Sequence, residues 1–204
     1  MLYKLAHFLF CLYLKVVYRW RVYGQENIPE QGPFIICANH IKWIDPVVVG
    51  CAFPRRLKVH FMAKEELFRN RFVSYFLRIG GAYPVNRNIA DYSAIRRSFQ
   101  LLSENKVLGM FPEGTRSKTG QLQKAQHGAA LIASRDCVPI IPVGIAGPYR
   151  AGRPLIVRIG KPFRLNKLEY NNREEKKVLL EQMSATIMEN IKCLLPDGDN
   201  MDPE

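Results

Sequence analysis

PFIICANHIKWIDPVVVGCAF, residues 33–53, begins the alternation of strands and helices from which the fold class is inferred. Its first six residues, 33–38, form an apolar run with the length and composition of a buried strand. A polar turn follows, and the apolar segment 45–53 after it predicts a short helix. A strand, a turn and a helix in succession indicate an α/β fold.

The alternation of strands and helices continues beyond this unit. Further strands are expected at 57–63, 106–111, 138–145 and 154–160, with a turn into a short strand at 80–85. Helical spacing of apolar residues predicts helices at 65–79, 90–104, 124–135 and 173–195. This order predicts a single-domain α/β sandwich with a largely parallel sheet flanked by helices.

The first 22 residues differ in composition from the rest of the chain. On a helical projection one side is apolar and contains Leu2, Leu5, Leu9, Leu12, Val16 and Trp20. A narrow stripe on another side contains Lys4, His7, Cys11, Lys15 and Arg19. The run between the lysines is well short of the roughly 20 residues that span a bilayer, and no signal-peptide cleavage site follows. Residues 1–22 are therefore predicted to form an amphipathic, membrane-associating helix, with docking on the protein's own core as the alternative.

Charge is unevenly distributed along the chain, which carries a formal net charge of +12. Residues 1–164 hold 25 Lys/Arg against 9 Asp/Glu, whereas residues 165–204 hold 5 against 9. The positive body favours anionic partners such as nucleic acid, an anionic membrane surface or phosphorylated substrates. The acidic end, 196–204, is expected to be a disordered tail.

The five cysteines are widely spaced, at positions 11, 37, 51, 137 and 193. Their odd number and the lack of a C-x-x-C pair argue against a disulfide framework and against a structural zinc site. Buried free thiols in a reducing compartment are expected. The sequence shows no metal-ligand set, so no metal is predicted at the functional site.

The turn after the first strand contains a candidate catalytic pair, His40 and Asp45. A carboxylate that accepts a hydrogen bond from one imidazole nitrogen fixes the tautomer and leaves the other nitrogen free to take a proton. The alternative is that Asp45 caps the helix at 45–53 and His40 packs beside Trp43. Serine and cysteine nucleophile motifs are absent, so a catalytic His40 would activate a substrate hydroxyl.

Two further strand ends carry unusual turns. FPEGTRS places Glu113 and Arg116 around Gly114 directly after an apolar strand. Glycine permits close backbone approach and arginine binds phosphate through a planar fork, although a turn with a surface ion pair would explain the same residues. Arg87 follows the short strand of GGAYPVNR, where a solvated side chain is the simple alternative.

Four segments in this order, NHIKWID, GGAYPVNR, FPEGTRS and VPIIPVGI, resemble the sequence blocks of the glycerolipid acyltransferase family. They fall within residues 39–145. F-P-E-G-T-R-S is highly specific, whereas H-x4-D alone is a weak signal. The chain looks most like the bacterial members that acylate lysophosphatidate. The resemblance implies a glycerolipid-acyltransferase-like fold, with the acyltransferase domain at 23–195.

The resemblance also implies a reaction. An acyl group would move from acyl-CoA or acyl carrier protein to the sn-2 hydroxyl of 1-acyl-sn-glycerol-3-phosphate, giving phosphatidic acid. His40 would take the hydroxyl proton while Asp45 orients the ring. Substrate-binding roles are implied for Arg87, Glu113, Gly114, Thr115, Arg116 and Lys124. No cofactor or metal is implied.

The expected partners are anionic membrane lipids, lysophosphatidic acid and the acyl donor, not nucleic acid. The expected location is the cytoplasmic face of the cell membrane, as a peripheral or monotopic protein. Basic residues outside the motifs, among them Arg55, Arg56, Lys58, Arg96 and Arg97, are candidates for donor docking. Two alternatives remain: an acyltransferase for another lysophospholipid or lyso-aminolipid, and a membrane-associated thioesterase in which His40 activates water.

Overall fold

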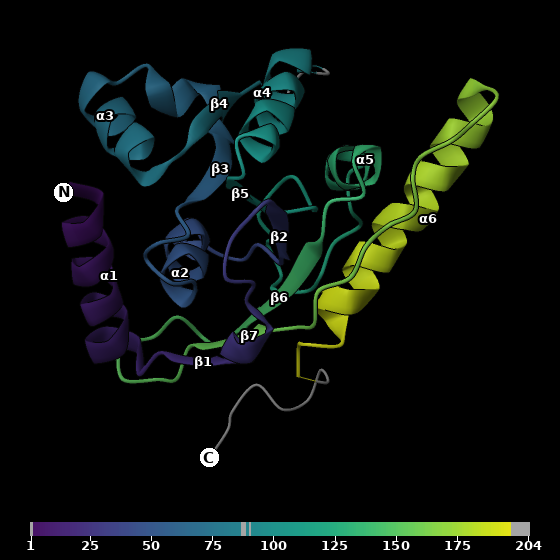
Figure 1. Cartoon of the computed structure of the whole chain (residues 1–204). Coiled ribbons are helices and arrows are strands. Elements are labelled where there is room, and N and C mark those ends of the chain that lie inside the picture. The colour runs from purple at the N-terminus through teal and green to yellow at the C-terminus, as the bar shows by residue number, and fades with distance from the viewer. Residues whose placement is uncertain (1, 87–88, 90, 197–204) are drawn as a thin grey trace.

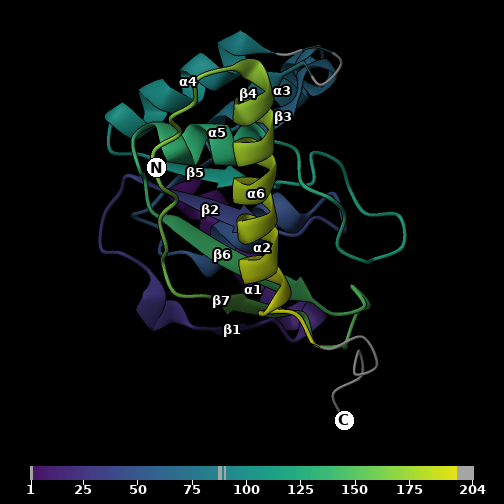
Figure 2. The ribbon, with the colours of Figure 1, turned by 90° about the vertical axis from the view of Figure 1, so that its right-hand side faces the viewer.

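The computed structural model describes residues 2–86, 89 and 91–196, and it has three layers (Figure 1). A seven-stranded sheet lies in the middle, with α1 (Leu2–Tyr18) and α2 (Asp45–Ala52) on one side. On the other side lie α4 (Tyr92–Ser103), α5 (Gly128–Arg135) and α6 (Arg173–Lys192), and Figure 2 shows α6 running across this face. The predicted α/β sandwich is therefore confirmed.

The sheet has the strand order β1-β7-β6-β2-β5-β3-β4. The strands are β1 (Arg21–Tyr23), β2 (Phe34–Ala38), β3 (Val59–Lys64), β4 (Tyr83–Val85), β5 (Val107–Met110), β6 (Ile140–Ala146) and β7 (Ile156–Ile159). The five strands β2 to β6 run parallel, and β7 is antiparallel to β6 and parallel to β1. The sheet is thus largely parallel, as the sequence predicts.

β2 lies in the centre of the sheet and is buried on both faces, which explains its uninterrupted apolar sequence. Phe34 and Ile36 point into the core beneath α1 and α2. Ile35 and Cys37 point into the core beneath α4, α5 and α6. Because successive side chains of a strand alternate between faces, one short strand contributes to both cores.

Several expected boundaries differ from those of the structure. The helix expected at 65–79 is a 3-10 turn, Glu65–Phe68, followed by α3 (Arg71–Gly80). The break occurs because the side chain of Asn70 accepts hydrogen bonds from the N–H groups of Phe72 and Val73, and so caps a new helix. The edge strand β1, three residues long, was not predicted.

The N-terminal helix α1 ends at Tyr18, before the expected boundary at residue 22. Its outer side exposes large apolar residues: Leu2, Leu5, Phe8, Leu9, Phe10, Leu12, Tyr13 and Val16. The neighbouring α3 also exposes Phe72, Val73, Tyr75 and Phe76. Within the described residues, α1 and the other helices are too short or too polar to cross a membrane.

Candidate active site

The candidate site lies at the edge of the sheet where the parallel strands end. His40 follows β2, and the FPEGTRS turn follows the neighbouring strand β5. The carboxyl ends of β2 and β5 meet at this edge, which is the usual position of ligand sites in open α/β sheets. The fold therefore brings together two turns that are about 70 residues apart in the chain.

His40 and Asp45 form the hydrogen bond that the sequence predicts. His40 Nδ1 lies 2.8 Å from Oδ2 of Asp45, and both side chains are buried. Because the carboxylate accepts at this position, the proton of a neutral ring sits on Nδ1 and Nε2 carries the lone pair. The alternative, in which Asp45 caps the helix and His40 packs beside Trp43, is wrong: no side chain caps α2, Trp43 is 73% exposed, and His40 stacks on Phe111.

The Asp45 carboxylate accepts the hydrogen bonds that hold the turn together, and it does not cap α2. Its Oδ2 also accepts hydrogen bonds from the N–H groups of Ile41, at 2.6 Å, and Lys42, at 2.8 Å. Its Oδ1 accepts a hydrogen bond from the Tyr149 hydroxyl. These four donors fix the carboxylate in one orientation, so the imidazole that it holds is fixed as well.

The main chain of His40 is held at both ends by the FPEGTRS turn. Its N–H donates to Oε1 of Glu113 at 2.8 Å, and its carbonyl accepts from the N–H of Ser117 at 2.7 Å. The second oxygen of Glu113 accepts from the N–H of Gln123 at 3.1 Å. Burial raises the pKa of Glu113. Glu113 thus braces the His40 turn, and both of its oxygens are occupied by backbone donors.

Aromatic stacking supports the imidazole ring from the side. The rings of His40 and Phe111 stack with centroids 4.1 Å apart, and the Phe61 ring stacks on Phe111 at 5.8 Å. The Phe61 ring lies over Gly109, where a Cβ on the backbone would come within 2.1 Å of a ring carbon. Glycine at 109 therefore leaves room for the Phe61 ring, which stacks on Phe111 and so supports the His40 ring.

An apolar cleft of about 160 Å³ opens beside His40. It is lined largely by the ends of β3, β4 and β5 and by the start of α5, with Met62, Val85, Met110, Phe111, Pro112 and Ala129 among its residues. Gly114 and Gln126 also line it. A buried imidazole at an apolar cleft suits a reaction in which a hydrocarbon chain accompanies the reacting group.

The other predicted site residues differ in their surroundings. Gly114 has a φ of +73°, which favours glycine. Thr115 and Arg116 are exposed at the tip of the same turn, next to Ser117. Lys124 forms an ion pair with Glu181 of α6 and lines a different hollow from the cleft. Arg87 lies outside the described residues.

Both the sequence and the fold are similar to those of known proteins. The family model described as acyltransferase matches residues 19–146. A 1-acyl-sn-glycerol-3-phosphate acyltransferase of Bacillus subtilis is 33% identical over 149 residues, covering 70% of this chain and 73% of the relative. The chain belongs to the acyltransferase family.

Two further relatives of the acyltransferase are informative. A Streptococcus pneumoniae protein of the same name as the Bacillus relative is 36% identical over 143 residues, which cover 66% of this chain and 52% of the relative. The chain thus matches about half the length of that protein. The crystal structure of the 1-acyl-sn-glycerophosphate (LPA) acyltransferase PlsC from Thermotoga maritima has a TM-score of 0.65 and 25% identity, covering 96% of this chain and 80% of that one.

Two residues of the acyltransferase site were not predicted from the sequence. The buried side chain of Asn39 donates to the carbonyl of Ile145 at 2.9 Å and accepts from its N–H at 2.7 Å, joining the end of β2 to β6. Tyr149 lies 104 positions after Asp45. Asn39 could have been singled out because it directly precedes His40 in the sequence. Tyr149 is distant from both His40 and Asp45 in the sequence, so its role depends on the fold.

A groove rich in arginine lies at the same sheet edge of the acyltransferase. It is called the arginine groove below, because its lining includes Arg19, Arg21, Arg153 and Arg158. The groove follows β1 and β7 and reaches the chain just after α1. Since β7 is antiparallel to β6, the start of β7 lies at the edge where the parallel strands end. The sequence predicted a positively charged body, but it did not predict that these four arginines line one groove.

Proposed function

We propose that the acyltransferase moves an acyl group from a thioester to the sn-2 hydroxyl of 1-acyl-sn-glycerol-3-phosphate, giving phosphatidic acid. The observation that carries this proposal is the buried His40–Asp45 pair beside an apolar cleft, in a chain of this family. The names of the Bacillus and Streptococcus relatives support lysophosphatidate as the acceptor. The donor, acyl-CoA or acyl carrier protein, belongs to the proposal as well.

His40 acts as the general base in this proposal. Its Nε2 takes the proton of the acceptor hydroxyl as that oxygen forms a bond to the thioester carbonyl carbon. The hydrogen bond from Nδ1–H to Asp45 stabilises the imidazolium that results. When the tetrahedral intermediate collapses, the C–S bond breaks and the thiolate receives the proton from His40. No covalent acyl-enzyme and no cofactor or metal is part of this step.

The acceptor phosphate is assigned to the FPEGTRS turn and the start of α5. Arg116 is one residue from Ser117, which is bonded to the His40 carbonyl. The first residues of α5, Gly128 and Ala129, line the cleft, and the amino end of a helix favours an anion. Arg87 is proposed as a second phosphate ligand on the basis of the sequence blocks. A phosphate at Lys124 would compete with Glu181, with which this lysine forms an ion pair.

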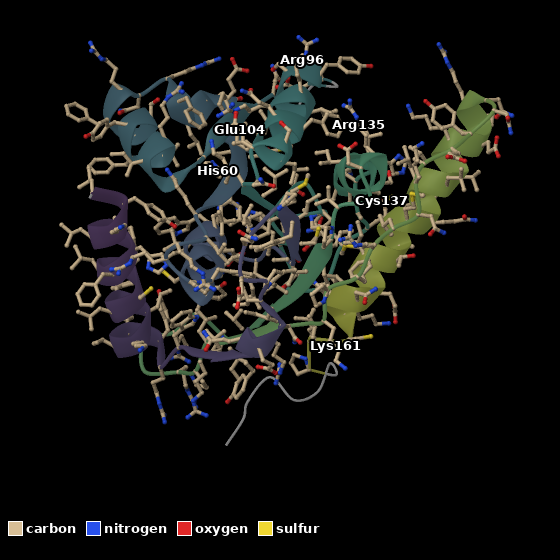
Figure 3. The ribbon with its side chains drawn as sticks, viewed as in Figure 1. His60, Arg96, Glu104, Arg135, Cys137 and Lys161 are labelled. Carbon is tan, nitrogen blue, oxygen red and sulfur yellow. The ribbon has the colours of Figure 1, made fainter. Side chains whose placement is uncertain are left out.

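The membrane is the proposed source of the acceptor. The exposed apolar side chains of α1 and α3 suit the interfacial zone of a bilayer. The arginine groove adjoins the carboxyl end of α1, so its guanidinium groups would meet anionic lipid headgroups when α1 is inserted. We infer peripheral attachment to the cytoplasmic face, where acyl thioesters are available. Basic residues such as Arg96, which projects from the outer end of α4 (Figure 3), remain candidates for donor docking.

The test is phosphatidate formation by the purified acyltransferase in vesicles that contain lysophosphatidate and a long-chain acyl thioester. General-base catalysis contributes about 10²–10⁴-fold, so His40→Ala is expected to lose nearly all turnover while still binding vesicles. If the protein acylates another lysolipid faster than lysophosphatidate, that lysolipid is the acceptor instead. Release of free fatty acid at the same rate with and without acceptor would support a thioesterase and overturn the proposal.

A further inference from the structure

A cluster of soft metal ligands lies between α1 and α2, on the side of α1 that faces the protein. His7 and Cys11 come from α1 and Cys51 comes from α2. One ligand atom from each side chain lies within 4.8 Å of the other two. Within the described part of the chain, no other three such side chains come as close together. The wide spacing of the cysteines in the sequence argued against a zinc site, but the fold brings two of them together.

The orientation of the His7 ring is the second observation. His7 Nε2 lies 3.2 Å from the carbonyl oxygen of Gly50, which can only accept, so Nε2 carries the proton. Nδ1 therefore holds the lone pair, and it faces Cys11 Sγ at 3.5 Å. A ligating histidine usually donates its other ring N–H to a carbonyl or carboxylate in this way. The ring is thus already held in a ligating tautomer.

The distances suit tetrahedral coordination. With a Zn–S distance of about 2.3 Å and a Zn–N distance of about 2.0 Å, the two ligand atoms of a tetrahedral zinc lie about 3.5 Å apart. The separation of His7 Nδ1 and Cys11 Sγ already has this value. Positions 7 and 11 are one helical turn apart, so they face the same way. Cys51 is buried, and its Sγ lies within 4.8 Å of the ligand atoms of His7 and Cys11.

The ligand types restrict the ion. Thiolate and imidazole select zinc or a similarly soft transition metal, and the cluster contains no carboxylate that would suit magnesium or calcium. We propose that His7, Cys11 and Cys51 form a binding site for Zn²⁺, with water as the fourth ligand. Each thiol releases its proton to solvent when it coordinates.

The site would fasten the membrane-facing helix to the catalytic turn. α1 packs against α2 (Figure 1), and α2 begins at Asp45, which orients His40. The ion would therefore fix the position of α1 relative to the candidate active site. It is separate from the chemistry proposed at His40, and this inference does not depend on the proposed acceptor or donor.

The experiment is a titration of chelator-treated, full-length protein with Co²⁺ under a phosphine reductant. Thiolate ligands give an intense near-ultraviolet charge-transfer band, and tetrahedral Co²⁺ gives strong visible bands. We expect both bands to saturate at one equivalent and to disappear when Zn²⁺ is added. Cys11→Ser and Cys51→Ala should each reduce the charge-transfer intensity, because only one thiolate remains, or weaken binding by more than the roughly 10–100-fold that loss of an outer partner costs.

Matched controls separate this site from other thiols. Cys137 lies on the opposite side of the sheet, beside α5 and α6 (Figure 3), and Cys137→Ser should bind Co²⁺ as the wild type does. If Cys51→Ala does not fold, as judged by circular dichroism, Cys11→Ser carries the test because Cys11 is only partly buried. No charge-transfer band in the wild type, an unchanged band in both cysteine variants, or a Cys11–Cys51 disulfide that persists under reductant would overturn the proposal.

Discussion

The hydroxyl of Tyr149 donates a hydrogen bond to Oδ1 of Asp45, on the opposite side of the carboxylate from His40. Tyr149 lies in the loop between β6 and β7, and its φ of +51° is uncommon for a residue with a side chain. Burial, and then the negative charge of Asp45, raise the pKa of Tyr149 well above its usual range, so the hydroxyl keeps its proton. The loop that supplies Tyr149 also supplies Arg153 of the arginine groove. One loop therefore contributes to both the His40–Asp45 pair and the groove.

Replacing Tyr149 by Phe removes this donor and leaves the aromatic ring. A hydrogen bond to a charged group is worth about 1.5–3 kcal/mol, so the free energy of unfolding should fall by that amount in a urea titration. Because Tyr149 positions Asp45 without facing the cleft, kcat should decrease while KM for the acceptor stays the same, and the pH profile of kcat should shift. Tyr18→Phe, on the ring that contacts Tyr149 edge-on at 6.1 Å, is the control. Equal effects of the two variants would contradict this role.

Asp45→Asn should reduce transfer by about 10²–10⁴-fold with little change in acceptor KM, because the amide no longer holds the imidazole in the required tautomer. The measurement is the rate of phosphatidate formation over a range of acceptor concentrations, which gives kcat and KM separately. Asp91→Asn provides the control: Asp91 caps α4 through the N–H groups of Ser93 and Ala94, and asparagine caps nearly as well. A similar loss in both variants would point to a general effect of removing a carboxylate.

Gly109→Ala tests the ring stack that supports His40. The new methyl group would meet the Phe61 ring at 2.1 Å, and Phe61 cannot move without disturbing Phe111 and His40. Overpacking of this kind costs about 1–3 kcal/mol, and turnover should fall as well because the imidazole shifts. Gly80→Ala is the matched control, since a Cβ there meets nothing within 4 Å. Full activity of Gly109→Ala would show that the stack does not position His40.

The strand–helix order and the His40–Asp45 contact were predictable because both depend on neighbouring residues. An apolar run of strand length and a polar turn are local patterns, and the four residues between His40 and Asp45 form one turn. The break at Asn70 was also local, but helical periodicity on both sides of it concealed the cap. Strand β1 was missed because three residues show no pattern until β7 lies beside them.

The support of the site was not predictable, because it depends on contacts between distant segments. Glu113 was assigned to the substrate from the motif alone, whereas the structure directs both of its oxygens to backbone N–H groups of the His40 turn and of Gln123. A substrate-binding role of Glu113 therefore remains a prediction. Tyr149 and the approach of Cys51 to α1 likewise depend on tertiary packing and leave no trace in sequence spacing.

We expect His60 to make the stability of the fold sensitive to mild acid. Burial, and then the positive charge of Lys58, lower the pKa of His60 to about 4. An unfolded histidine takes its proton near pH 6.5, so between about pH 6.5 and pH 4 the unfolded chain binds more protons and the native state loses stability as pH falls. In urea titrations across this range, His60→Gln should lose less stability than the wild type. Parallel curves for the two proteins would show that His60 does not contribute.

The arginine groove should govern binding to anionic membranes. Each basic residue near such a surface contributes about 1 kcal/mol, so Arg21→Gln with Arg153→Gln should lower partitioning into anionic vesicles by roughly thirtyfold. The difference should shrink at high salt, where exposed charges are screened, and it should be absent with neutral vesicles, where the apolar face of α1 acts alone. The control removes the same charge through Lys161→Gln and Arg173→Gln, since Lys161 is exposed and lies beyond the far end of β7 (Figure 3). If the control lowers binding as much as the groove variant does, net charge rather than the groove determines attachment.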